Sequence, residues 1–242
     1  MPVIKWHEAE PCSFVLFHHI PKCAGSAFSK ALAHYYGERY EWFHGPDGAL
    51  AAMLSDLNNG HAAVGGHFSI TDPKFHRLCE CRDFILTTTF REPVERVISN
   101  YYYLLNTRKH FLHSVARKHT LSEVFKKGLG HKLQLSNEVT KMLGGTGEDD
   151  DCLQRAKDAV DRYTIFGLQE QMPTLARLFQ ELLGVGFVVT RAPAPYHRPR
   201  IEDIDSHTIG LIKEYNQQDI ALHRHVKAVY DYKLMHDWRT HE

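Results

Sequence analysis

Short apolar runs bounded by turn residues alternate along this chain with stretches in which apolar side chains recur every three or four positions. A run of four to eight apolar residues between turn signals is typical of a buried strand. The strongest signal is 84–90, which is rich in β-branched and aromatic residues. The expected strands lie at 13–19, 62–65, 84–90, 163–166 and 186–190.

Helical periodicity follows two of these strands directly. Apolar residues between 28 and 35 share one helical face, and Gly37 predicts the end of that helix. After 84–90, Pro93 suits a first helical turn, and an apolar stripe begins at Val94. Two strand–loop–helix units predict a parallel sheet with crossover helices. We therefore expect an α/β fold of three layers, with a mainly parallel sheet flanked by helices.

The rest of the chain fits this arrangement. No internal repeat or linker divides it, so one domain is expected across residues 1–242. The remaining expectations are an extended arm at 1–12, a short helix at about 48–57, a mostly helical polar stretch at 106–160 with an acidic loop at 144–151, a helix at about 172–183, a proline-rich loop at 191–200, and helix to about 232 with a break near 216–218.

Composition narrows the possible partners. The 242 residues are 43% hydrophobic, which suffices for a sizeable core. Lys plus Arg equals Asp plus Glu, at 29 each, so we expect no general attraction to nucleic acid or anionic membrane, although a local basic cleft remains compatible with this balance. No apolar run approaches the roughly 18 residues that span a bilayer. The start of the chain does not resemble a signal peptide. A cytoplasmic location is expected, and the oligomeric state is open.

Cysteine and histidine usage argues against a disulfide framework or a metal site. The five cysteines include no C-x-x-C pair, and an odd number suits a reducing compartment. Among the 18 histidines, His18 and His19 point to opposite faces of a strand. His223 and His225 lie two residues apart on an expected helix and do not converge either.

The loop that follows the first strand has the features of an anion site. Loop and first-turn N–H groups point at a ligand there, and the helix dipole favours negative charge. The amides of 24–27 are placed to hold a terminal phosphate, and Ser26 adds a hydroxyl or caps the helix. Lys22 reaches an oxygen between that phosphate and the group attached to it. Alternatively, Pro21 and Gly25 merely turn the chain, with Lys22 in solvent.

This loop differs from a Walker A motif. There the lysine follows the second glycine and precedes a magnesium-binding hydroxyl. Here Lys22 precedes Gly25, and Gly-Lys-Ser/Thr occurs nowhere in the chain. The order of residues therefore disfavours an ATPase or kinase.

The second unit supplies another candidate phosphate contact. Arg91 follows the 84–90 strand, and Ser99 lies on the next helix, displaced about 140° from Val94 and so on a polar flank outside the core. A guanidinium and a hydroxyl together suit a phosphate. The alternative is that Arg91 pairs with Glu92 or Glu95.

Taken together, these segments resemble the sulfotransferases that use 3′-phosphoadenosine 5′-phosphosulfate (PAPS), especially the carbohydrate branch that includes heparan sulfate 2-O-sulfotransferases. Segment 17–26 is similar to the family's 5′-phosphosulfate loop. Segment 89–101 is similar to its 3′-phosphate motif, with Arg91 and Ser99 at the phosphate-binding positions. Weaker similarities follow in order at 66–68, 137–144, 166–170 and 216–222.

The resemblance implies the sulfotransferase fold, with a P-loop-like anion loop, and transfer of a sulfuryl group from PAPS to a hydroxyl or amine of a small-molecule or carbohydrate acceptor. The product is 3′-phosphoadenosine 5′-phosphate (PAP), and no metal is required. Lys22 would stabilise the charge on the bridging oxygen. The implied cofactor-binding residues are Lys22, Cys23, Ala24, Gly25, Ser26, Ala27, Arg91, Ser99, Arg198 and Arg200.

Several roles within this resemblance have alternatives. His67 resembles the family's base and suits proton transfer near neutral pH, with His19 as the second candidate; otherwise His67 packs or caps a turn. Arg198 and Arg200 cover the nucleotide, contact an anionic acceptor, or form a solvated basic loop. The family often has threonine at Cys23, which we interpret as a small loop filler rather than a reactive thiol. The competing functions are a magnesium- and ATP-dependent kinase and a non-catalytic PAP-binding module.

Overall fold

The computed structural model describes residues 14–43, 50, 61–81, 83–145, 147, 150–186 and 198–238. Within them, five strands form one sheet in which every pairing is parallel. In spatial order the strands are β2 (Tyr40–Phe43), β3 (Ala63–Gly66), β1 (Val15–His18), β4 (Ile85–Phe90) and β5 (Ile165–Leu168). The strands of the two expected units, β1 and β4, are therefore neighbours.

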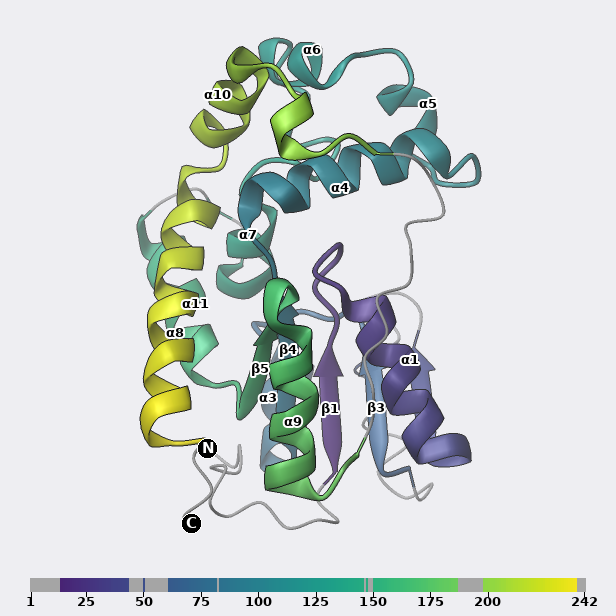
Figure 1. Cartoon of the computed structure of the whole chain (residues 1–242), viewed down its shortest axis with the longest axis vertical. Coiled ribbons are helices and arrows are strands. Elements are labelled where there is room, and N and C mark those ends of the chain that lie inside the picture. Colours follow the sequence, from purple (N-terminus) through teal and green to yellow (C-terminus); the bar gives the residue numbers. More distant parts are fainter. Residues whose placement is uncertain are drawn as a thin grey trace.

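Helices flank this sheet on both faces (Figure 1). In that view α1 and α9 lie in front of the sheet and α3 lies behind it, while α8 and α11 lie beside β5. These helices are α1 (Gly25–Tyr36), α3 (Pro73–Cys81), α8 (Asp150–Asp161), α9 (Met172–Leu183) and α11 (Gln217–His236). The arrangement is an α/β fold consistent with three layers.

A second group of helices, here named the helical cap, stands beyond the carboxyl ends of the strands (Figure 1). It consists of α4 (Pro93–Asn106), α5 (His113–Ala116), α6 (Leu121–Lys126) and α10 (Ser206–Glu214). Helix α7 (Glu138–Gly144) packs against α8 and α11. Three short 3-10 turns complete the described elements: η2 (Gly37–Arg39), η4 (Gln169–Gln171) and η5 (Ile201–Asp203).

Two hydrophobic clusters correspond to these two regions. The larger cluster contains the sheet residues, and all four residues of β1 are buried, as expected for a parallel strand covered on both faces. The smaller cluster joins α4 to α6 and α10 through residues such as Val97, Phe125 and Ile212. The site-bearing edge of the sheet therefore lies between two packed cores.

The structure confirms most of the expected elements. β1, β3, β4, β5, α1, α4 and α9 occur at the predicted places, and α10 ends at Glu214, two residues before the expected break near 216–218. The sequence missed β2 and α3. β2 is a half-buried edge strand of four residues that lies next to turn signals, so its pattern is weak. The expected loop at 144–151 ends early, because α8 begins at Asp150.

Other expectations fall largely on residues outside those described: the arm at 1–12, the helix at about 48–57, the strand at 186–190 and the loop at 191–200, of which only 198–200 are described. No helix in the described part of the chain is both long enough and apolar enough to cross a membrane.

Candidate functional site

The loop between β1 and α1 turns through two left-handed residues that are not glycine. Lys22 has φ 68° and Ala24 has φ 67°, a conformation that costs roughly 1–2 kcal/mol per residue. Gly25 then begins α1, and a Cβ at this position would overlap the imidazole of His19. The loop is therefore folded tightly onto the end of β1, and backbone strain of this kind tends to occur at functional sites.

The first turn of α1 presents uncapped amides. Ala24 precedes the helix and provides no side-chain cap. The N–H of Cys23 donates to a carbonyl of the preceding turn at 3.4 Å, and the N–H of Ala27 donates to Ala24 at 3.0 Å. The amides of Ala24, Gly25 and Ser26 donate to no backbone carbonyl within the described residues. Three adjacent donors at the positive end of a 12-residue helix form a site suited to an anion.

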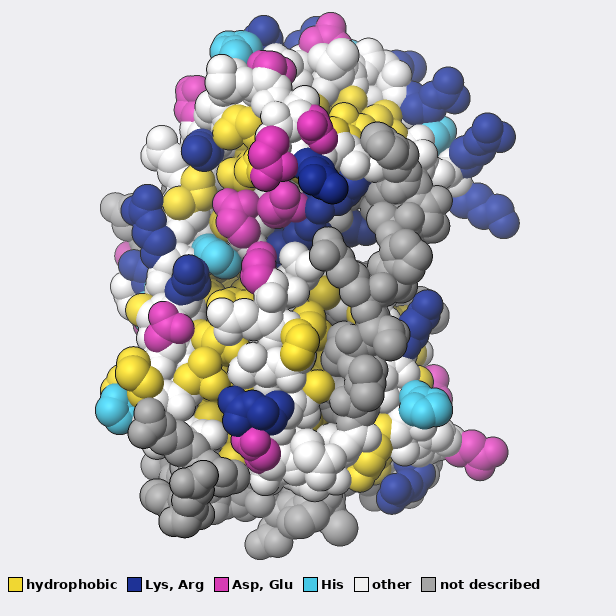
Figure 2. All heavy atoms as spheres, in the orientation of Figure 1, with side chains coloured by type: hydrophobic (Ala, Val, Ile, Leu, Met, Phe, Trp, Pro, Cys, Tyr) yellow, Lys and Arg dark blue, Asp and Glu magenta, His cyan; other side chains and the backbone are white. Residues whose placement is uncertain are grey.

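Three cationic side chains from distant parts of the sequence meet beside this turn. The Lys22 Nζ lies 4.0 Å from the ring centre of Tyr103, on α4. Arg91 Nη1 donates to the Lys22 carbonyl at 3.2 Å. Burial, together with the positive charges of Arg91 and Arg198, lowers the pKa of Lys22 to about 8. Figure 2 shows Lys and Arg side chains gathered below α4, next to a group of acidic side chains.

Glu95 joins the two arginines. Its Oε2 accepts hydrogen bonds from Arg91 Nη2 at 2.8 Å and from Arg198 Nη2 at 2.7 Å. Partial burial opposes ionisation of Glu95, but the hydrogen bond from Arg198 and the two positive charges outweigh it and lower the carboxyl pKa. The pairing of Arg91 with Glu95, an alternative left open by the sequence, is therefore present. Among the described residues, Glu95 is the one carboxylate paired with either arginine.

Two donors in this cluster have no acceptor. Arg91 Nε and Arg198 Nη1 are buried and lack a hydrogen-bond partner within the described residues, and the Arg91 side chain is only 9% exposed. A buried donor without a partner costs about 1–3 kcal/mol. An added anion that accepts these N–H groups would recover this free energy.

The other two expected phosphate contacts differ from each other. Ser99 is 6% exposed, on a polar flank of α4 that also carries the buried Arg96 and Asn100. Arg200 is exposed, and its N–H donates to Asp203 Oδ2 at 3.0 Å. The structure thus brings Arg198 into the cluster, whereas it places Arg200 at the surface.

His67 is held in one orientation next to the loop. Its Nδ1 lies 2.9 Å from the backbone carbonyl of His19. A carbonyl only accepts, so Nδ1 carries the proton and Nε2 of the neutral ring carries the lone pair. The contact exists because β1 and β3 are adjacent and both end at this edge of the sheet. Burial, followed by the proximity of the His67 and His18 rings and of the Lys22 ammonium, lowers the pKa of His19 to about 3, so His19 is a weak base near neutral pH.

The structure supports the interpretation of Cys23 as a loop filler. Its side chain is fully buried, and burial raises the pKa of its thiol to about 12 although Arg96 and Arg91 act in the opposite direction. A thiol of this kind is protonated at physiological pH and unreactive.

Sequence reasoning missed the polar junction that supports the cluster. Asn137 Oδ1 accepts the N–H groups of Gln218 (3.1 Å) and Asp219 (3.2 Å) at the start of α11. In return, Asp219 Oδ1 accepts the N–H of Thr140 in α7 at 2.8 Å. Arg96 Nη2 lies 3.7 Å from Asp219 Oδ2, which anchors α4 to both helices. Segments 137–144 and 216–222, which have weak similarity to the family, therefore cap each other's helices. The asparagines at the two helix starts, Asn137 and Asn216, are typical cap residues and could have indicated this junction from the sequence.

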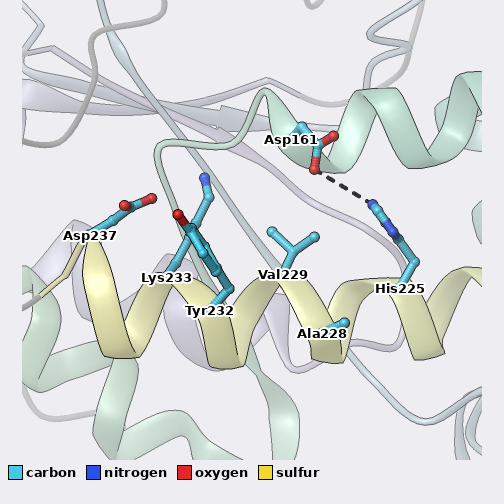
Figure 3. A pocket seen from close by; sticks show the side chains of 7 residues that line it. All are labelled: Asp161, His225, Ala228, Val229, Tyr232, Lys233 and Asp237. Carbon is cyan, nitrogen blue, oxygen red and sulfur yellow. Dashed lines mark ion pairs between the residues drawn. The ribbon is translucent and has the colours of Figure 1, made fainter.

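A separate hollow of about 440 Å³ lies between α11 and the end of α8 (Figure 3). In it His225 Nε2 faces Asp161 Oδ1 at 3.5 Å. Lys233 Nζ donates to the carbonyl of Tyr163, just before β5, at 2.7 Å. This hollow therefore lies at the amino end of β5, away from the loop. In the described ranges no three His, Cys, Asp or Glu side chains are grouped so that they could hold a metal ion.

Comparison with known proteins adds no family assignment: no protein-family model matches the chain, and neither does any curated protein. The features that bear on function are therefore the geometry at the carboxyl ends of the strands and the residues that converge there.

Proposed function

We propose that this protein is a sulfotransferase that moves a sulfuryl group from PAPS to a hydroxyl or amine of an acceptor, a carbohydrate or glycoconjugate. The observation that carries the proposal is the convergence of Lys22, Arg91 and Arg198 on the uncapped first turn of α1, with the carboxylate of Glu95 between the two arginines. Such a site is built for a ligand with more than one anionic group.

The residues present fit PAPS in two parts. The β1–α1 loop would act as the P-loop-like cradle, in which the amides of Ala24, Gly25 and Ser26 hold the 5′-phosphate. The unpartnered N–H groups of Arg91 Nε and Arg198 Nη1 would donate to oxygens of the 3′-phosphate. Four further contacts with PAPS remain predictions: Ser99, Cys23, Ala27 and Arg200. Ser99 is less suited to direct contact than the sequence indicated, because it is buried. The same holds for Cys23 and Ala27, because their amides already donate to backbone carbonyls.

PAPS supplies a sulfuryl group that is already activated by its phosphate leaving group. Lys22 is placed to stabilise negative charge on the oxygen that bridges sulfur and phosphorus, and preorganised charge of this kind is usually the largest contribution to catalysis. His67 would take the acceptor proton at Nε2. Its Nδ1–H bond to the His19 carbonyl fixes both the tautomer and the ring orientation that this role needs.

Replacement of His67 by alanine tests the base. We expect kcat to fall by about 10²–10⁴-fold, the range for loss of general base catalysis, while the affinity for PAP stays near that of the wild type. His34→Ala is the matched control, because His34 is exposed on α1. An unchanged kcat in His67→Ala would rule out this assignment.

The activity itself is tested by PAP release from PAPS over a panel of sugars, glycolipids, phenols and amines. Binding of PAP measured by calorimetry separates the alternatives. Tight PAP binding without turnover on any acceptor indicates a non-catalytic module. Binding of ATP that depends on magnesium, without binding of PAP, indicates a kinase and contradicts the proposal.

A further inference from the structure

The helical cap carries a surface with one sign of charge, although the whole chain has a net charge of zero. No acidic residue occurs between Glu95 and Glu123. Within this span four basic side chains are exposed on either side of α5, and none of them forms an ion pair with an acidic side chain of the described residues. We name this the α5 surface; its basic residues are Arg108, Lys109, Arg117 and Lys118.

Short-range structure brings these residues together. The N–H of Arg117 donates to His113 at 3.0 Å, and the N–H of Lys118 donates to Val115 at 3.1 Å, so the helical turn continues through both. The turns before α5 are hydrogen-bonded as well, from the N–H of His110 to Thr107 and from the N–H of His113 to His110, each at 2.9 Å, so one continuous run of turns carries both basic pairs. In Figure 2, Lys and Arg side chains project from the upper right of the molecule, where Figure 1 places α5.

An aromatic side chain protrudes from the same surface. Phe111 is 77% exposed, more than any other large hydrophobic side chain in the described residues. The turn that carries it is well supported: Leu112 is buried, and its N–H donates to His110 Nδ1 at 3.1 Å. His113 Nδ1 bonds the Leu104 carbonyl at 2.8 Å. These contacts fix the residues on both sides of Phe111, so its ring points into solvent because of the backbone conformation of this turn.

We propose that the α5 surface docks onto a membrane that contains anionic lipid headgroups, with Phe111 inserted among them. Basic side chains gain free energy near such headgroups, and an apolar ring gains more by entering the interface. A dissolved polyanion would also interact favourably with the basic side chains. However, one face of the Phe111 ring already stacks on His110, with ring centres 4.7 Å apart, and is not available to stack on such a ligand. The ring is thus less suited to stacking than to insertion.

The placement relates this surface to the candidate site. Arg91 lies just before α4 and Glu95 in its first turn, Tyr103 lies in its last turn, and the α5 surface begins after its end. One helix of 14 residues therefore links both. Docking would hold the site close to the headgroup layer, which is where a membrane-attached acceptor would be found.

The test is co-sedimentation of the full-length protein with vesicles of phosphatidylcholine alone and with vesicles that also contain phosphatidylserine. We expect binding only to the second kind, weakened by high salt. Two exposed pairs, Arg108→Gln with Lys109→Gln and Arg117→Gln with Lys118→Gln, should each weaken it by about tenfold or more. Phe111→Ser should weaken it by about tenfold, whereas Phe111→Trp should bind and show a blue-shifted emission.

The matched control replaces one exposed lysine and one exposed arginine on α3, Lys74→Gln with Arg77→Gln, and should bind as the wild type does. Equal thermal midpoints verify that the variants fold. Absence of vesicle binding by the wild type overturns the proposal, and so does binding that the α3 pair weakens as much as the α5 pairs. Binding of a single-stranded oligonucleotide without binding of vesicles overturns it in favour of a polyanion.

Discussion

The two strand–loop–helix units of this protein are neighbours in the sheet but present their helix starts differently. α1 begins after two left-handed residues and has no side-chain cap. α4 begins at Pro93, and Glu92 Oε2 caps it by accepting the N–H of Glu95 at 2.7 Å. The first unit therefore offers main-chain donors to an anion. The second caps the N–H of Glu95 with its own side chain and offers the side chain of Arg91 to an anion instead.

The two units therefore depend on different kinds of residue to bind an anion. In the first unit the chain path supplies the donors, so the critical residues are those that fix the path or add charge: Gly25 and Lys22. In the second unit the donors belong to side chains, and Glu95 sets their orientation. Substitutions in the two units should therefore have different signatures, and the following variants test this in order of expected effect.

Among substitutions within the two units, Lys22→Ala should have the largest effect on transfer. Loss of a preorganised charge at the breaking bond typically lowers kcat by about 10²–10³-fold. The rate of PAP release measures it, and binding of PAP should fall much less. Lys30→Ala, an exposed lysine on α1, is the control. A Lys22→Ala rate within about twofold of the wild type would contradict a role for this charge in the transition state.

The same lysine predicts a pH dependence. Its pKa is lowered from 10.5 to about 8 by burial and by the charges of Arg91 and Arg198. Anion affinity should therefore be highest below pH 8 and fall as the pH rises through about 8, and this step should be absent in Lys22→Ala. Because the folded pKa is the lower one, the unfolded state binds more protons between pH 8 and 10.5, so this group makes folding more favourable as the pH rises through that window.

Gly25→Ala should disrupt the path of the first unit. The added Cβ would overlap the His19 ring, and overpacking of this kind costs about 1–3 kcal/mol. We expect a lower free energy of unfolding in denaturant titrations and weaker PAP binding. Gly210→Ala is the control, since nothing lies within 4 Å of a Cβ there and alanine favours the helix. Equal effects of the two substitutions would show that the close contact with His19 is unimportant.

Arg91→Ala should weaken PAP binding by about 10–100-fold, the value of a hydrogen bond to a charged group, with little change in the free energy of unfolding. Calorimetry measures the affinity. Arg177→Ala is a close control, because Arg177 also pairs with a glutamate four residues later, at 3.0 Å, but on the solvent-facing side of α9. Wild-type affinity for PAP in Arg91→Ala would remove Arg91 from the proposed 3′-phosphate contact.

Local patterns predicted both units because each is contained in about 25 residues. β1, β4, α1 and α4 follow from apolar periodicity, and Lys22 and Arg91 follow from their places after strands. Contacts across long separations could not be predicted in the same way. Arg198 reaches Glu95 over 103 residues, and Tyr103 lies over Lys22 only because α4 crosses the end of the sheet. The burial of Ser99 likewise depends on helices that pack around α4, so its exposure was not readable from its own helix.

Cys23→Ala should have the smallest effect, although Cys23 lies in the first unit beside Lys22. Its thiol is buried, and burial raises its pKa to about 12, so it contributes volume and no charge. We expect PAP affinity within about twofold of the wild type and a loss of stability of about 1 kcal/mol from the small cavity. Iodoacetamide should leave Cys23 unmodified in the native protein, as peptide mass spectrometry would show, and should modify it after unfolding in denaturant. Rapid alkylation of the native protein at Cys23 would indicate a thiolate at the helix N-terminus, and the first unit would then depend on a side chain in the same way as the second.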